Sequence, residues 1–223
     1  MPHALSARHA APPDRKTLRL IMRCARHLVI FARRPRLGSG KRRLARDIGA
    51  IEALRFQRVM LARLLRRLGR DPRWTTWLGI TPDRSGPWPR GIATLPQGGG
   101  DLGQRMARVA RHMPPGPVVI IGSDIPDIAA SDIAAAFRAL GSKSAVFGPA
   151  RDGGYWLVGL RRRPRFIDPF ANVRWSSVYA LADTLANLAG KEAAMLRTLS
   201  DIDDGEAWRV NGRREASYAC SHV

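Results

Sequence analysis

Short apolar runs alternate with longer amphipathic segments along most of this chain. The short runs predict buried strands, and we place these at residues 27–32, 74–80, 92–95, 118–121, 145–148, 156–160 and 196–199. Apolar residues at helical spacing predict helices at residues 50–68, 102–112, 131–140 and 176–188. Strands that alternate with helices are typical of a parallel sheet covered on both faces. The pattern therefore predicts a single three-layer α/β/α domain with a mostly parallel central sheet.

The two ends of the chain lack this pattern. Residues 1–26 are basic, contain proline and show no periodicity, so we predict a disordered N-terminal extension. Met22 lies just before the first strand, and we hypothesise that it is the true start. The domain is expected to cover residues 27–210, followed by a polar tail at residues 211–223.

The formal charge of +20 on 223 residues is typical of proteins that bind nucleic acid or another polyanion. However, only four of the 38 basic residues are lysines, a ratio that GC-rich codon usage also produces. No RNA-binding signature or zinc finger is present, so we do not expect nucleic acid as the partner. A non-enzymatic binder of acidic partners stays open as a minor hypothesis.

The sequence contains two cysteines and no CxxC motif, so neither a cysteine-based metal site nor a disulfide framework is indicated. No apolar run reaches the length of a membrane span. Arginines interrupt the only early apolar stretch, which argues against a signal peptide. We therefore expect a cytoplasmic protein.

Acidic residues follow three of the predicted strands. Asp124 follows strand 118–121, Asp152 follows strand 145–148, and Asp203 follows strand 196–199. The carboxyl ends of parallel strands share one edge of a sheet, which is where ligands of such sheets bind. Carboxylates there suit Mg²⁺ or Mn²⁺, which prefer oxygen ligands. The alternative is that Asp124 is only a loop or cap residue.

A basic loop follows the first strand. Gly38 and Gly40 allow the backbone to bend and to approach a ligand closely. The side chains of Arg33, Lys41 and Arg43 are candidates for phosphate binding. The loop lacks the first glycine and the Ser or Thr of a Walker A motif. The alternative interpretation is a solvated basic turn.

Two glycine-containing stretches are further candidates for substrate contact. Asp101 ends a glycine-rich loop and is expected to cap the helix that follows, where a nucleotide or phosphate can also bind. Gly153 and Gly154 first of all indicate a turn between two strands. They also leave room for a substrate beside Asp152, with Tyr155 next in the chain.

Five short motifs in this order resemble the DUF2064 family of the GT-A glycosyltransferase-like superfamily. They lie at residues 31–44, 100–106, 122–126, 148–155 and 201–203. The resemblance implies a GT-A fold that binds a nucleotide or nucleotide-sugar. Arg42 and Asp204 depart from the expected pattern, because threonine stands at both positions in many members.

Transferred to this chain, the resemblance implies that Asp124 and Asp203 hold a divalent metal, Mg²⁺ or Mn²⁺. Arg33, Lys41 and Arg43 would line the phosphate side, and Asp152 would face the second substrate as a candidate base. The leading hypothesis is a metal-dependent glycosyltransferase with a nucleoside-diphosphate sugar and a small-molecule acceptor. The alternative is a nucleotidyltransferase that acts on an NTP and a phosphorylated substrate and releases pyrophosphate. The donor, the acceptor, the anomeric outcome and the oligomeric state stay open.

Overall fold

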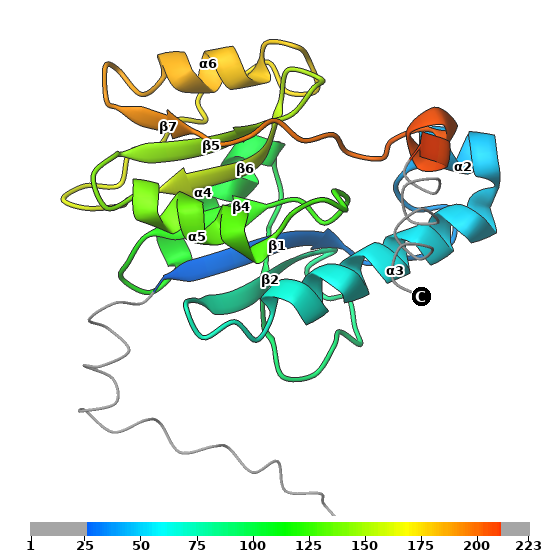
Figure 1. The fold of residues 1–223 in the computed structure, drawn as a ribbon. Helices are drawn as coiled ribbons and strands as arrows, with labels where there is room; N and C mark the ends of the chain where they lie inside the picture. The colour runs from blue at the N-terminus through cyan, green and yellow to red at the C-terminus, as the bar shows by residue number, and fades with distance from the viewer. Residues whose placement is uncertain (1–25, 211–223) are drawn as a thin grey trace, which may run out of the picture.

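The computed structural model describes residues 26–210, which are built around a seven-stranded sheet (Figure 1). The strand order is β3-β2-β1-β4-β6-β5-β7. The strands are β1 (His27–Arg33), β2 (Thr75–Thr81), β3 (Ala93–Pro96), β4 (Val118–Ile121), β5 (Ala145–Pro149), β6 (Tyr155–Leu160) and β7 (Ala193–Met195). The predicted N-terminal extension, the Met22 start and the polar tail lie outside the described residues, apart from Arg26.

The sheet is mostly parallel, as predicted. β1 pairs in parallel with β2 and β4, β2 pairs in parallel with β3, and β5 pairs in parallel with β7. Only β6 runs antiparallel, against both β4 and β5. Its direction follows from the short Arg151–Gly154 turn, because a few residues can join antiparallel neighbours but not parallel ones.

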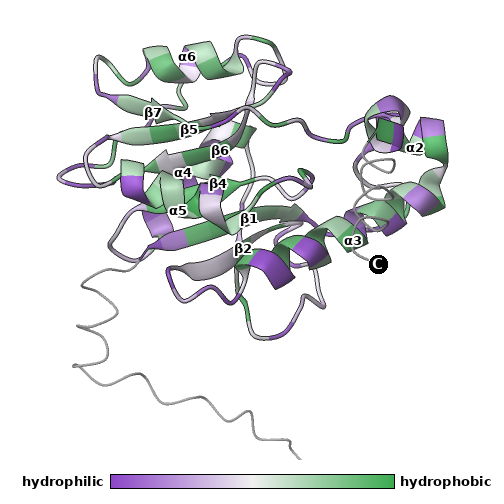
Figure 2. Ribbon diagram, viewed as in Figure 1, coloured by the Kyte–Doolittle hydropathy of each residue, from purple (hydrophilic) through white to green (hydrophobic). Residues whose placement is uncertain are grey.

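The described helices are α2 (Arg42–Ile48), α3 (Ala50–Leu68), α4 (Leu102–His112), α5 (Ala130–Ala139) and α6 (Ala180–Ala186). α3 to α6 cover the two faces of the sheet, whereas α2 packs on α3 away from the strands (Figure 1). Neighbouring strand residues point to opposite faces, so Ile30 packs in the core below α3 and α5 whereas Val29 packs in the core below α4 and α6. Figure 2 shows hydrophobic residues along β1 and β5 and alternating hydrophobic and hydrophilic residues along α3.

Burial of these apolar strands is the main stabilising contribution. Leu28, Val29 and Ile30 are fully buried, and burying each such side chain stabilises the fold by roughly 1.5–3 kcal/mol. None of the helices in residues 26–210 combines the length and the apolar character that crossing a bilayer requires.

The structure corrects the prediction at the basic loop. Residues 42–48 form α2, which was not predicted. Leu44 is its single buried residue, and the basic residues around it give no apolar repeat at helical spacing. Leu44 packs with Ala53 of α3 and with Ile202, which belongs to the segment after β7. Ala207 of a short helix at residues 205–210 packs against this small third core, and Figure 1 shows that helix beside α2.

Three element boundaries were also predicted wrongly. The last strand lies at Ala193–Met195, because the chain leaves the sheet edge and Leu199 forms only an isolated bridge. α5 begins at Ala130, one residue before the predicted start, and its N-cap is Ala129, whose N–H donates to the Asp132 carboxylate. α6 begins later than residue 176 because Ser176 adopts a left-handed conformation with φ 58°, which a helix cannot continue.

Candidate functional site

The carboxyl ends of β1, β4 and β5 meet at one edge of the sheet, because these strands run in the same direction. Asp124 follows β4, and Asp152 lies in the turn after β5. The segment after β7 runs back along this edge, where the Leu199 N–H donates to the Pro149 carbonyl and the Ile202 N–H donates to the Asp124 carbonyl. The structure therefore brings the segment with Asp203 next to Asp124.

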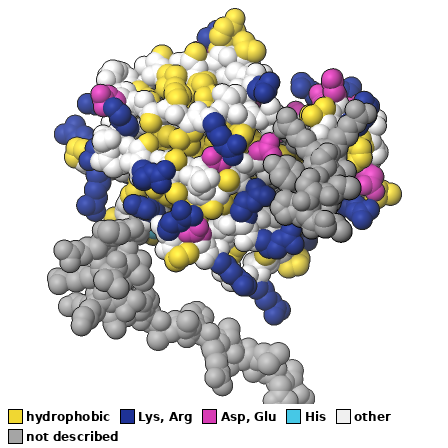
Figure 3. Space-filling view, viewed as in Figure 1, with side chains coloured by type: hydrophobic (Ala, Val, Ile, Leu, Met, Phe, Trp, Pro, Cys, Tyr) yellow, Lys and Arg dark blue, Asp and Glu magenta, His cyan; other side chains and the backbone are white. Residues whose placement is uncertain are grey.

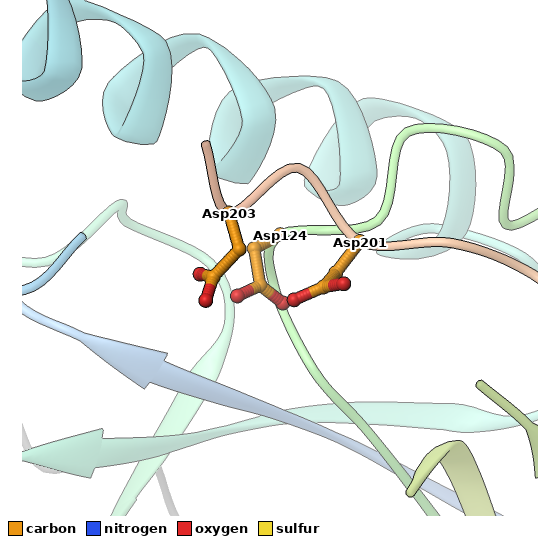
Figure 4. A group of neighbouring side chains, drawn as sticks. All are labelled: Asp124, Asp201 and Asp203. Carbon is orange, nitrogen blue, oxygen red and sulfur yellow. The ribbon is translucent and has the colours of Figure 1, made fainter. Parts of the chain in front are cut away.

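Three carboxylates converge at this edge, and we call Asp124, Asp201 and Asp203 the acidic cluster. Each offers an oxygen that lies within 4.8 Å of the oxygens of the other two. Figure 4 shows the three side chains pointing toward one another, one from the loop after β4 and two from the segment after β7. Hard oxygen donors at this spacing suit a divalent cation such as Mg²⁺ or Mn²⁺.

The ammonium of Lys41 lies within the acidic cluster. Its Nζ is 2.7 Å from Asp124 Oδ2, 2.9 Å from Asp203 Oδ1 and 3.9 Å from Asp201 Oδ2. Burial alone would lower the pKa of Lys41, but the carboxylates of Asp124 and Asp203 outweigh it and raise that pKa. Lys41 is therefore a buried, charged counter-ion of the cluster.

Of the three carboxylates in the acidic cluster, Asp201 lies farthest from the Lys41 ammonium, so its negative charge is compensated least. Burial raises its pKa above the usual value, and the charges of Asp124, Asp203 and Asp152 raise it further, whereas Lys41 opposes the shift. Asp152 therefore adds to the negative charge that acts on Asp201. A divalent cation would relieve the repulsion among these groups.

A first cavity of about 210 Å³ opens beside the acidic cluster. Its lining includes Arg33, Lys41, Ser123, Asp124 and Asp203, together with the α3 residues Phe56, Gln57, Met60 and Leu61. Arg33 and Lys41 are the cationic lining residues, and they make the first cavity suitable for phosphate groups. Arg105 of α4 does not line this cavity, and its guanidinium is held by the Gln97 side-chain oxygen, 3.1 Å away. Burial and then the positive charge of Arg33 lower the pKa of Arg105.

A second cavity of about 620 Å³ is lined by Asp201 of the acidic cluster and by neighbouring residues of the segment after β7. Its charged lining residues are Asp127, Arg151, Arg197, Asp201, Asp204 and Glu206. The Arg197 guanidinium is committed to the Asp132 carboxylate at 2.7 Å, and it also donates to the Asp127 carbonyl. Asp201 belongs to the acidic cluster and also lines the second cavity, so it borders both.

The remaining basic-loop residues lie at the rim. Arg43 is largely exposed, and its guanidinium is 3.9 Å from Asp203 Oδ2. Gly38 and Gly40 both have φ 74°, which confirms that the loop needs glycine to bend there. No other described side chain or backbone atom lies within 4 Å of a Cβ placed on Gly38.

The turn between β5 and β6 is built on its glycines. Asp152 Oδ1 accepts a hydrogen bond from the Gly154 N–H at 3.0 Å, and the Asp152 side chain is exposed. Gly153 has φ 85° and lies against the backbone of Val178. Tyr155 packs against Phe147 in the core, and burial raises the pKa of its hydroxyl.

Asp101 is the N-cap of α4, as predicted. Its Oδ1 accepts from the Gln104 N–H at 2.7 Å, and the Gln104 side chain accepts from the Asp101 N–H, which completes a capping box. Gly98 and Gly100 of the preceding loop have positive φ angles. The Arg108 guanidinium lies against Gly98, so a side chain at residue 98 would require this arginine to shift.

Asp201 is a residue of the acidic cluster that was not predicted as a site residue. It lies two positions before the predicted Asp203, so in an extended segment both point to one side while Ile202 points into the small core. That alternation was a readable signal for Asp201.

Basic side chains do not gather into one patch on the face that Figure 3 shows. Lys and Arg lie there in several separate groups, with acidic and apolar residues between them. A nucleic-acid interface would present a continuous basic strip.

The fold and its ligand edge define an α/β domain of the nucleotide-diphospho-sugar transferase type. A family model for the DUF2064 family, described as an uncharacterized protein conserved in bacteria, matches residues 64–177. The chain belongs to this family. No curated protein sequence matches the chain significantly.

Solved structures support this fold. A protein of Desulfovibrio desulfuricans G20, provisionally described as a nucleotide-diphospho-sugar transferase, is 28% identical with a TM-score of 0.74, over 81% of this chain and 83% of that one. The 4-diphosphocytidyl-2C-methyl-D-erythritol synthase of Anaerococcus prevotii is 12% identical with a TM-score of 0.56, over 86% and 96%. A CMP:2-keto-3-deoxy-manno-octonic acid synthetase complexed with CTP is 12% identical with a TM-score of 0.54, over 87% and 99%.

Proposed function

We propose that this protein is a metal-dependent glycosyltransferase that uses a nucleoside-diphosphate sugar and a hydroxyl-bearing acceptor. The observation that carries the proposal is the acidic cluster, which borders two cavities at the ligand edge of the sheet. A transfer reaction needs two substrates to meet at one point, and this arrangement provides a place for each. The 28% identical relative, with its provisional description, supports the same class.

The first cavity is the proposed donor site. Arg33, at the end of β1, and Lys41, just before α2, both line this cavity and offer positive charge to the diphosphate. Their charges favour the departing diphosphate more strongly as its negative charge develops. A related fold was solved with CTP, which supports a nucleotide as the ligand.

Asp124, Asp201 and Asp203 are the proposed metal ligands. The cluster fits a cation, because three carboxylate oxygens converge and a cationic ammonium already lies among them. When bound, Mg²⁺ or Mn²⁺ would supply charge neutralisation for the diphosphate leaving group. Asp201 also faces the second cavity, so the cluster connects both substrate sites.

The second cavity is the proposed acceptor site, and Asp152 is the proposed base. Asp152 is exposed, and one of its oxygens is oriented by the Gly154 N–H. The exposed carboxylate can accept the proton of an acceptor hydroxyl as the new glycosidic bond forms.

Nucleotidyl transfer is the second candidate, and the cations of the first cavity are compatible with it. Arg33 and Lys41 suit a triphosphate as well as a diphosphate. Pyrophosphate release from an intact NTP would support this reading over glycosyl transfer.

The test is ligand-dependent thermal stability combined with product analysis. Wild-type protein is incubated with NDP-sugars or NTPs, with and without Mn²⁺, beside Asp124→Asn and Asp168→Asn. Asp168 is the matched control, because its carboxylate pairs with Arg111 at 2.6 Å and lies outside the acidic cluster and outside both cavities. We expect Mn²⁺-dependent stabilisation by an NDP-sugar in the wild type and the control, and turnover at least about 100-fold lower in Asp124→Asn. If no nucleotide stabilises the wild type, both transferase readings fail.

A further inference from the structure

The protein places its own cation where the acidic cluster would hold a metal. The Lys41 ammonium is within 2.9 Å of both Asp124 and Asp203, and its side chain is only 8% exposed. Three carboxylates would otherwise repel one another at this spacing. The ammonium compensates one of the three charges, and it uses the same oxygens that a divalent cation requires.

The surroundings of Lys41 allow the ammonium to leave. Within residues 26–210, the ion pairs of this ammonium are all with carboxylates of the acidic cluster. Lys41 also lines the first cavity, together with Arg33 and Ser123, so its flexible side chain borders the space proposed for the diphosphate. The residue itself follows Gly40 and has φ 44°, which turns the chain sharply just before α2.

We propose that Lys41 is an exchangeable counter-ion that keeps free divalent cations out of the acidic cluster. The metal then enters together with the nucleotide, and the ammonium moves from the carboxylates to the diphosphate. This inference rests on the proposed function and specifies the order of binding at the same site.

Electrostatics gives the exchange its direction. A metal ion that binds alone would have to push the ammonium away from its carboxylates toward Arg33, which also carries a positive charge. Like charges in a partly buried site repel strongly. A diphosphate in the first cavity removes this obstacle, because it offers the displaced ammonium new anionic oxygens. Metal and nucleotide therefore help each other to bind, by the same factor in both directions.

The experiment titrates Mn²⁺ alone, by calorimetry and thermal shift, into the wild type, Lys41→Met and Arg43→Met. Arg43→Met is the matched control, since it removes one positive charge beside Asp203 without vacating the cluster. We expect Lys41→Met to melt at a lower temperature without metal and to bind Mn²⁺ at least about tenfold tighter than the wild type. Arg43→Met is expected to bind Mn²⁺ about as weakly as the wild type.

Equal Mn²⁺ affinity of the wild type and Lys41→Met would overturn the inference, even if the transferase assay succeeds. Failure of UDP and CDP to stabilise the wild type in Mn²⁺ would instead contradict the proposed function. Should Lys41→Met not fold, the exchange is tested with the wild type alone, by thermal shift with Mn²⁺, with UDP and with both. Its stabilisation by Mn²⁺ and UDP together is then expected to exceed the sum of the separate effects, and simple additivity would refute the exchange.

Discussion

Gly153→Ala tests whether the turn after β5 is fixed by its backbone. Gly153 has φ 85°, and a Cβ there would lie 2.3–2.6 Å from the Val178 backbone, which cannot move aside like the end of a flexible side chain. The left-handed conformation costs an alanine about 1 kcal/mol, and overpacking adds about 1–3 kcal/mol. The sum of about 2–4 kcal/mol corresponds to a melting temperature lowered by roughly 5–15 °C for a domain of this size.

Gly38→Ala is the matched control for this prediction. Gly38 has a similar φ of 74°, but a Cβ there meets no described atom within 4 Å, so only the conformational cost of about 1 kcal/mol applies. Thermal melts of both variants, with urea unfolding as a second measure, separate the two contributions. Equal melting temperatures for the two variants would show that contact with Val178 does not constrain the turn.

Three further changes probe the fold. His27 is buried, and burial lowers its pKa from the usual 6.5, so this histidine takes up a proton at a higher pH in the unfolded chain than in the folded one. The melting temperature should therefore fall as the pH drops from about 7.5 to 5.5. His27→Gln should flatten the dependence of the melting temperature on pH over this range. Asp132→Asn removes the charge that holds Arg197 at 2.7 Å and should lower the urea midpoint, at a cost of about 1–3 kcal/mol; an unchanged midpoint would contradict this. Asp101→Ala should cost about 1 kcal/mol in the same assay, because the Gln104 N–H loses its cap.

The sheet was predictable because each buried strand is a short run of consecutive apolar residues. Val118–Ile121 is apolar throughout, as a strand covered on both faces requires, and the structure confirms it as β4. α2 was not predictable in this way. Its only buried residue is Leu44, and that residue is buried by Ile202, which lies far away in the chain.

The candidate site was predictable in its location but not in its contacts. Acidic residues after parallel strands indicated one edge, and the structure places Asp124 and Asp203 there. Lys41 was predicted to bind phosphate, and that role stays a prediction, while the structure shows its ammonium against the carboxylates. Local sequence cannot reveal this pair, because it depends on the segment after β7 returning across the sheet edge.

The charges of the two cavities separate the two candidate reactions. The first cavity brings Arg33 and Lys41 to bear on phosphates in either reaction. The second cavity differs, since Arg197 is bound to Asp132, and the carboxylates of Asp201, Asp204 and Glu206 line this cavity together with Arg151. A phosphorylated substrate, as nucleotidyl transfer requires, would meet repulsion there, whereas a neutral polyol would find hydrogen-bond acceptors. The lining of the second cavity therefore favours glycosyl transfer to a hydroxyl group.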